Sequence, residues 1–196
     1  VPSVDFDQGY KTTYTHEEYV VELPIEAKLL EDGMWKEITD SATNLGQSAA
    51  LKREYDAVSV FNGAFTASAP YLGADAVALC SASHPYGPQK TGSTQTNTFA
   101  LSLTKDNVAT IREAMMAFHD DAEQLIAVTP NALIVPPGKE DDAMVIAGSL
   151  LKPGTANNDL NPHAGRFDVI VHPYMDSTSW FMVDTSMMKM HLDWFN

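Results

Sequence analysis

The sequence predicts an α+β protein, and two patterns of apolar residues carry that prediction. Apolar and polar residues alternate over residues 18–29, which is the pattern of a half-buried strand. The spacing then changes to three and four over about 33–65, which predicts one long amphipathic helix. Shorter apolar runs and helical stripes follow, so we expect a small sheet with helices packed on it in the second half of the chain.

The first third of the chain is expected to be elongated. Residues 1–17 are polar and aromatic and predict an extended arm, and Pro24 marks an edge or a bend in the strand that follows. Asp32 is the expected N-cap of the long helix. At 1.5 Å per residue this helix would span on the order of 45 Å, more than the width of a small domain. Because its apolar stripe drifts after Ala49, we favour a helix that crosses a flat plate over a coiled coil.

The middle of the chain predicts a short strand, a long loop and a helix. Residues 76–81 form an apolar run that is typical of a strand, and residues 84–98 are rich in Gly, Pro and Thr. A loop of that length is uncommon in a compact domain unless it has a function. Thr104 is the expected N-cap of a second helix, which ends near His119.

The last third of the chain predicts four strands and one helix. Residues 125–128 and 133–135 are strand-like, and Pro136 and Pro137 stop the second run. A third helix is expected over about 139–151, with three acidic residues in its first turn, where the helix dipole favours anions. After a polar loop at 153–166, residues 169–171 and 180–183 are expected to form a hairpin.

The charge of the chain bounds its partners. Twelve basic against 26 acidic residues give a net charge of −14. Such a surface repels phosphate, so sequence-specific nucleic-acid binding is not expected. An acidic surface does suit a container for nucleic acid, because like charge keeps the contents from adhering to the wall; solubility alone is the alternative reading.

Cysteine content and hydropathy say little about compartment. Cys80 is the only cysteine, so no internal disulfide can form. No apolar run approaches the roughly 18 residues of a membrane span, and no membrane partner is expected. Residue 1 is Val and the chain ends within an apolar run, so we expect a piece of a longer polypeptide.

The possible catalytic and metal-binding groups do not form a recognisable motif. Cys80 and His84 lie four positions apart, which on a strand separates them by about 13 Å, too far for a thiolate–imidazole pair. The histidines and the acidic residues beside them lack the spacing of a metal site. We therefore expect no catalytic residue, no cofactor and no metal.

Aromatic residues on irregular segments are the feature that remains. Loops on a rigid scaffold often carry function, and exposed Tyr, Trp and Met favour interfaces. The arm, the loop at 84–98, the loop at 153–166 and Tyr174 are of this kind. The alternative is that they are simply loops.

Several strings, in this order along the chain, resemble a known family. They are Phe6-Asp7-Gln8-Gly9-Tyr10, Leu79-Cys80-Ser81-Ala82-Ser83-His84-Pro85, Leu133-Ile134-Val135-Pro136-Pro137, Pro153-Gly154-Thr155-Ala156-Asn157-Asn158-Asp159 and Trp180-Phe181. Together they resemble the major capsid proteins of tailed bacteriophages, in particular the Mu-like major head subunit group.

The resemblance implies the HK97-type capsid fold, with an E-loop, a P-domain that contains a long spine helix, and an axial A-domain built on a small sheet. Residues 1–30 would be the arm, E-loop and return strand. Residues 31–119 would be the P-domain, with the spine at about 33–65. Residues 120–196 would be the A-domain and the return toward the P-domain. Family members begin earlier and continue further, which again implies a partial chain.

The function implied is that of a structural head subunit in the virion, assembled in the host cytoplasm. It would form hexamers and pentamers with copies of itself, enclose DNA, and meet scaffold, portal or decoration proteins. The expected assembly contacts are Phe6, Tyr10, Tyr14, Tyr19, Asn157, Asn158 and Tyr174. Two other classes stay open: a hydrolase that uses Asp and His residues, distinguished by activity or bound metal, and a binding module, distinguished by remaining monomeric at high concentration.

Overall fold

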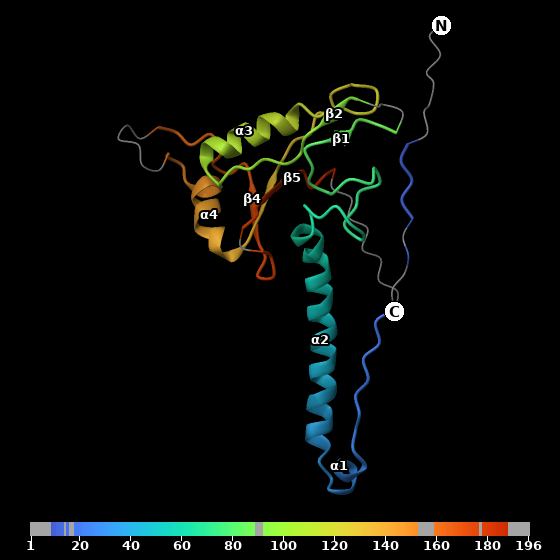
Figure 1. The fold of residues 1–196 in the computed structure, drawn as a ribbon. Coiled ribbons are helices and arrows are strands. Elements are labelled where there is room, and N and C mark those ends of the chain that lie inside the picture. The colour runs from blue at the N-terminus through green and yellow to red at the C-terminus, as the bar shows by residue number, and fades with distance from the viewer. Residues whose placement is uncertain are drawn as a thin grey trace.

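A three-stranded sheet organises the second half of the molecule (Figure 1). The computed structural model describes residues 9–13, 15, 18–88, 92–152, 159–176 and 178–187. The central strand is β3 (Ala132–Val135), which pairs in parallel with β4 (Asp168–Val171) and antiparallel with β5 (Phe181–Val183). The chain between β3 and β4 contains α4 (Glu140–Gly148), the kind of crossover that a parallel pair requires. The sequence therefore predicted mixed helix and sheet correctly.

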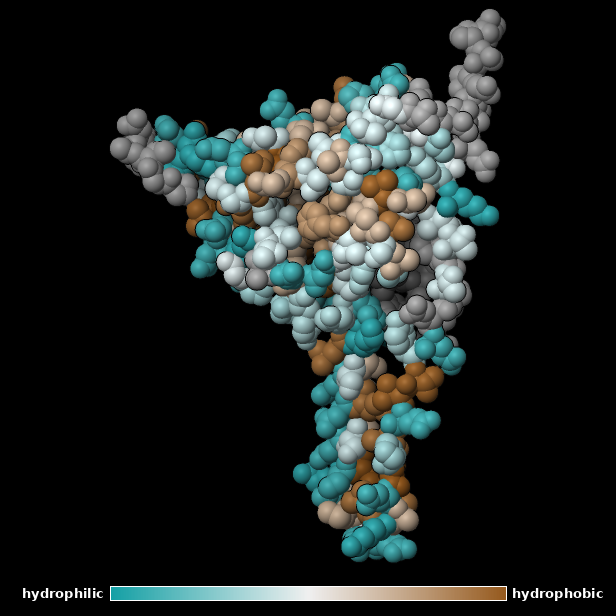
Figure 2. Space-filling model, in the orientation of Figure 1, coloured by the Kyte–Doolittle hydropathy of each residue, from teal (hydrophilic) through white to brown (hydrophobic). Residues whose placement is uncertain are grey.

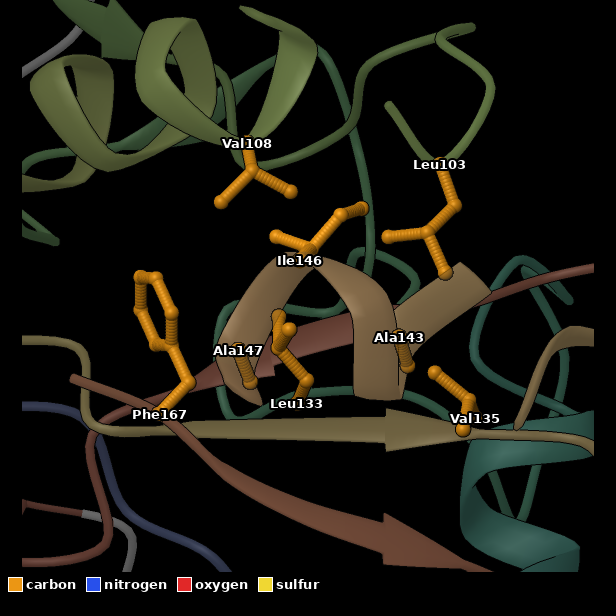
Figure 3. Packing of buried hydrophobic residues seen from close by; sticks show 8 residues of the cluster. All are labelled: Leu103, Val108, Leu133, Val135, Ala143, Ile146, Ala147 and Phe167. Carbon is orange, nitrogen blue, oxygen red and sulfur yellow. The ribbon is translucent and has the colours of Figure 1, made fainter. Parts of the chain in front are cut away.

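The two faces of β3 are covered by different helices, because successive side chains of a strand point to opposite faces. On one face, Leu133 and Val135 are fully buried beneath α4 and α3 (Lys105–Met116). Figure 3 shows this cluster, which comprises Leu103, Val108, Leu133, Val135, Ala143, Ile146, Ala147 and Phe167. On the other face, Ile134 packs with Val58 and Met175. The sheet thus joins the small helices to the long one.

The long helix is α2 (Trp35–Asn62), and its 28 residues span about 42 Å. It extends from the body of the molecule as a shaft (Figure 1). The sequence prediction of one helix over about 33–65 is confirmed with narrower bounds, but Asp32 is not its N-cap. Asp32 is instead the C-cap of a short helix, α1 (Ala27–Glu31), and Met34 precedes α2 without a side-chain cap. Between them Gly33 adopts a left-handed φ of 69°, which a glycine accepts without steric cost.

The turn after β4 ties the shaft to the sheet. The Asn62 side-chain amide donates to the Tyr174 carbonyl at 2.9 Å, and its oxygen accepts from the Asp176 N–H at 2.8 Å. The ring of Tyr55 meets that of Tyr174 edge-on, with centroids 6.4 Å apart. Nε2 of His172, in the same turn, lies 3.3 Å from a carboxylate oxygen of Glu54. The body end of α2 is therefore held by both apolar packing and hydrogen bonds.

The helices of the sheet layer agree with their sequence signals. The Thr104 hydroxyl accepts from the Asn107 N–H at 3.3 Å, so the predicted N-cap of α3 is confirmed, although α3 ends at Met116 rather than near His119. A 3-10 turn, η1 (Pro137–Lys139), leads into α4, which ends three residues earlier than expected. The predicted acidic first turn of α4 is present.

Three predicted strand features are wrong. Residues 76–81 make only one bridge, between Leu72 and Ala78, because the left-handed backbone of Ala76 breaks the extended run. Residues 125–128 are likewise not a strand, with left-handed backbone at Glu123 and Ala127. The expected terminal hairpin does not form, since β3 lies between β4 and β5.

The described ends of the Gly/Pro/Thr segment at 84–98 form paired strands rather than irregular loop. Its ends pair antiparallel as β1 (His84–Pro85) and β2 (Thr94–Gln95). The Asn97 side chain then bridges back, accepting from the Ser81 N–H and donating to the Leu79 carbonyl, both at 2.7 Å. These bonds fix the hairpin against the segment that follows α2.

Candidate assembly surface

The shaft of α2 exposes several large apolar side chains to solvent. Val58 is the only buried residue of the helix, while Trp35 is 63% exposed. Leu51 and Tyr55 are also exposed, and Figure 2 shows hydrophobic side chains along the shaft. Burial of apolar surface contributes about 25 cal/mol per Å². Contiguous exposed apolar patches on protein surfaces often mark interaction sites.

An extended segment, residues 18–26, accompanies the shaft and is equally exposed. In Figure 1 it runs beside α2 toward α1. Val20 and Val21 are 71% and 70% exposed. The predicted half-buried strand over 18–29 is therefore wrong in this chain: the alternation is present, but no described residue provides a ladder partner, and the last residues belong to α1. A strand requires a neighbouring strand to satisfy its backbone groups.

The Lys52 side chain connects this segment to the helix. The Lys52 ammonium lies 4.7 Å from the centroid of the Tyr19 ring and also forms an ion pair with Asp56. The hydrogen bond that Lys52 donates to the Asp56 carboxylate raises the pKa of Lys52. The Lys52 ammonium over the Tyr19 ring holds the segment beside α2 but leaves it exposed to solvent.

A large apolar cavity opens where α2 meets the sheet layer. It has a volume of about 920 Å³ and lies between the C-terminal end of α2, α3, β5 and residues 97–102. Aromatic rings form much of its wall, and Phe65 and Phe181 stack at 6.0 Å between centroids. The Trp180 indole donates to the Leu101 carbonyl at 3.0 Å across it. Among the described residues that line it, Lys139 is the one that carries a charge.

The predicted assembly residues fall in two groups. Phe6, Tyr14, Asn157 and Asn158 lie outside the described residues. Tyr10, Tyr19 and Tyr174 are described, and each exposes 40% or more of its surface. Tyr19 and Tyr174 lie against Lys52 and Tyr55, which are three positions apart and so on one face of α2. The structure thus brings two of the seven residues to one stretch of the shaft.

Cys80 and His84 both take part in contacts within the fold rather than forming a reactive pair. Both nitrogens of His84 have partners: Nδ1 lies 2.7 Å from Asp75 Oδ2, and Nε2 lies 3.2 Å from the Leu79 carbonyl. Burial raises the pKa of Cys80 to about 11, so its thiol is protonated at neutral pH. A protonated thiol is a poor nucleophile. These residues hold the 75–84 turn together.

The remaining polar groups also serve the fold. Asp184 accepts from the Thr129 N–H at 2.7 Å and from Ser186, and the Ser186 hydroxyl lowers the pKa of that carboxyl. His163 is buried, and its pKa is lowered mainly by desolvation. Within the described ranges no group of three or more His, Cys, Asp or Glu side chains is placed to hold a metal ion. The helices described here are too short or too polar to cross a membrane.

The cavity is the feature that sequence reasoning missed. Its walls come from six separate parts of the chain, so no local sequence pattern predicts it. The sequence feature that comes nearest to predicting the cavity is Phe99-Ala100-Leu101. This apolar run follows the predicted loop at 84–98 and belongs to no predicted helix or strand.

One protein family matches nearly the whole chain. A family model described as "Phage capsid protein" matches residues 11–195. Among solved structures, the chain is similar to the capsid of bacteriophage JBD30 decorated with minor capsid protein trimers, with 23% identity and a TM-score of 0.32. That similarity covers 36% of this chain and 23% of the other chain. A search of curated proteins finds no match.

Proposed function

The chain belongs to the phage capsid protein family and is a structural capsid protein, and from this we propose that it is the major head subunit, which assembles with copies of itself into an icosahedral shell enclosing DNA. The observation that carries the proposal is the exposure of the shaft. Of the 28 residues of α2 one is buried, and the apolar side chains that it exposes would be unfavourable in water if the molecule stayed isolated. Packing between copies would remove that surface from water.

We assign the fold to the HK97 type on the same premise. In this assignment α2 is the spine helix of a P-domain over residues 31–119. Residues 1–30 form the arm, E-loop and return strand, and residues 120–196 carry the A-domain and the return toward the P-domain. The exposed alternation in 18–26 supports an E-loop, since a segment that pairs with another copy would retain a strand pattern without a partner in its own chain. From the sequence strings we further propose a head subunit of the Mu-like group.

The proposed contacts between copies are those of the arm, the E-loop and the A-domain loop. Phe6, Tyr10, Tyr14 and Tyr19 would bury apolar area against neighbouring spine helices. Asn157 and Asn158 would meet their counterparts around the five- and six-fold centres, and Tyr174 would contribute beside α2. Head-to-tail contacts of this kind close into rings by rotation, and a shell multiplies many modest contacts.

The interior of such a shell would hold DNA without reading its sequence. A net charge of −14 repels phosphate and so leaves the contents free of the wall. The occupied state of His84 and the protonated thiol of Cys80 support a structural rather than a catalytic role. Scaffold, portal or decoration proteins would be further partners, with the virion as the final location and the host cytoplasm as the place of assembly.

The double substitution Tyr14→Ala and Tyr19→Ala tests the E-loop contacts. Tyr19 is 59% exposed, so its removal should leave the subunit folded by circular dichroism while the yield of shells in electron micrographs falls. Replacement of Leu150, an apolar residue outside the arm and E-loop that is 75% exposed, by Ala is the control for lost surface hydrophobicity. Unchanged shells in the double variant would contradict the contacts.

A further inference from the structure

The sequence after the last described residue has the pattern of a half-buried strand. Its apolar residues are Met188, Met190, Leu192 and Trp194, and the polar residues between them are Lys189, His191 and Asp193. These residues lie outside the described ranges. We propose that residues 188–194 pair with the free edge of β5 in the same chain and fill the apolar cavity. The inference goes beyond the proposed function, because it concerns the single subunit before any assembly.

The cavity follows one edge of β5. All three residues of β5 line it together with residues 178–180, whereas β3 contributes none of the described lining residues. Because β3 lies on one side of β5 in the order β4-β3-β5, the cavity lies along the side that has no strand neighbour in the described sheet. Such an edge presents backbone groups that another strand can pair with. Protein interiors keep few voids larger than a water molecule, so an apolar space of about 920 Å³ beside this edge is expected to be filled.

A tight turn directs the chain back along this edge. The Met187 N–H donates to the Asp184 carbonyl at 3.2 Å, which is the hydrogen bond that closes a four-residue β-turn. The Asp184 carboxylate accepts from the Thr129 N–H at 2.7 Å, and the Asn131 side chain accepts from the Thr185 N–H at 3.0 Å. These bonds anchor the turn to the segment that precedes β3. A β-turn reverses the chain, so the residues that follow are directed antiparallel to β5.

The turn also determines which face of the new strand meets α2. Pairing that continues directly from the turn places Met190 opposite Phe181. Opposite residues of an antiparallel pair lie on the same face, and the other apolar residues of the run follow Met190 on that face. The Phe181 ring meets the rings of Phe61 and Phe65, with centroids 5.2 and 6.0 Å away. The apolar face of the strand would therefore pack against the aromatic wall at the end of α2.

The charges agree with the same register. Asp193 would lie opposite Thr178, beyond the end of β3 at which η1 leads into α4. Lys139, the charged residue of the lining, is the last residue of η1. Asp193 would also lie on the face of Met182, which pairs with Leu133 beneath α4. The acidic residue of the segment and the basic residue of the lining thus fall at the same end and on the same face.

The same chain is the favoured donor of this strand. Residue 188 follows the turn directly, and Val183, at the other side of the turn, lines the cavity. A tethered segment has a high effective concentration at a site within its reach. A second copy in dilute solution lacks this advantage, so the pairing is expected in the isolated subunit.

Disulfide trapping in the full-length chain, kept too dilute to assemble, tests the pairing. One protein carries Cys80→Ser, Ser179→Cys and Leu192→Cys, and the register places its two cysteines opposite each other, within reach of a disulfide. The control replaces Leu192→Cys by Asp193→Cys, which points to the other face of the strand. We expect mild oxidation to link the first pair within one chain, as read by mass spectrometry and by gel mobility, and to leave the control reduced.

Three results would overturn the proposal. A disulfide-linked dimer in place of the internal link would assign the strand to a second copy. Reduced cysteines in both proteins would leave the cavity to an apolar ligand or another partner, and equal linking of both would contradict the register.

Hydrogen exchange on the unsubstituted subunit gives a second readout that needs no variant to fold. Amides of residues 188–194 should exchange slowly at the same low concentration, whereas exchange at the rate of an unfolded peptide would contradict the pairing. Electron micrographs at higher concentration decide the proposed function separately, because the internal link is expected whether or not shells form.

Discussion

Two glycines, one inside the long helix and one just past its C-terminal end, should respond in opposite directions to the same substitution. Gly46 lies inside α2, and a Cβ built on it meets nothing within 4 Å. Gly63 follows the last residue of α2, and a Cβ there would lie 2.4–2.6 Å from ring carbons of Tyr71. The substitution is the same at both positions, but the surroundings of the new methyl group differ.

The expected magnitudes follow from those surroundings. Gly46→Ala should stabilise the protein by about 1 kcal/mol, because alanine loses less backbone entropy in a helix interior. Gly63→Ala should destabilise it by about 1–3 kcal/mol, because the new methyl displaces the Tyr71 ring from a packed position. The two variants should thus differ by about 2 kcal/mol or more.

Urea unfolding followed by far-ultraviolet circular dichroism measures both values. The experiment is done at a protein concentration too low for assembly, so that contacts between copies do not contribute. Equal midpoints for the two variants would refute the packing of Tyr71 against the end of α2. A loss of stability for Gly46→Ala would refute the open surroundings of the shaft.

Three further outcomes follow from single groups. Asn62→Ala removes both hydrogen bonds to the turn after β4 and should lower the free energy of unfolding in urea by about 1–3 kcal/mol. Asn44→Ala, on the exposed part of α2, should change it little. Equal effects of the two substitutions would contradict the contact between α2 and the turn after β4. Because burial lowers the pKa of His163, the unfolded chain binds more protons than the folded chain below about pH 6.5. The free energy of unfolding should therefore fall as the pH is lowered from ~7.5 to ~5.5, and it should fall less in His163→Gln. An identical pH dependence of the two proteins would exclude His163 as the cause. With a pKa of about 11, Cys80 should react slowly with iodoacetamide at pH ~8 until the protein is unfolded, and its alkylation should abolish no activity; rapid labelling of the folded protein, read by mass spectrometry, would contradict its burial.

The sequence predicted best those elements whose signals are local. The three-and-four spacing located α2, and the Thr104 cap located the start of α3. β3 was predicted from a continuous apolar run and is buried at all four positions, which is typical of a strand covered on both faces. In each case the residues that carry the signal are the residues that form the element.

Strand pairing could not be predicted in the same way. Alternation over 18–29 records which side chains favour burial, but not whether a ladder partner lies in the same chain, and here none of the described residues provides one. The order β4-β3-β5 depends on β3, which is distant in sequence from β5 and intervenes between two runs that look like a hairpin. Ala76 adopts a left-handed backbone that its residue type does not announce.

The candidate surface was predictable in part. The aromatic residues of the arm and of residues 18–26 were identified from their pattern, and the structure places Tyr19 against the shaft. The cavity was not, because β5, α3 and residues 97–102 meet only once the sheet has formed. A surface built from distant segments has no signature in any one of them.

Electron microscopy of the purified full-length chain at increasing concentration, with light scattering on the same samples, tests most directly whether this subunit exists to tile with its copies. Closed shells of uniform diameter are the expected result, accompanied by a steep rise in scattering above a threshold concentration. Single subunits at every concentration, with scattering that grows only in proportion to protein, would contradict the account.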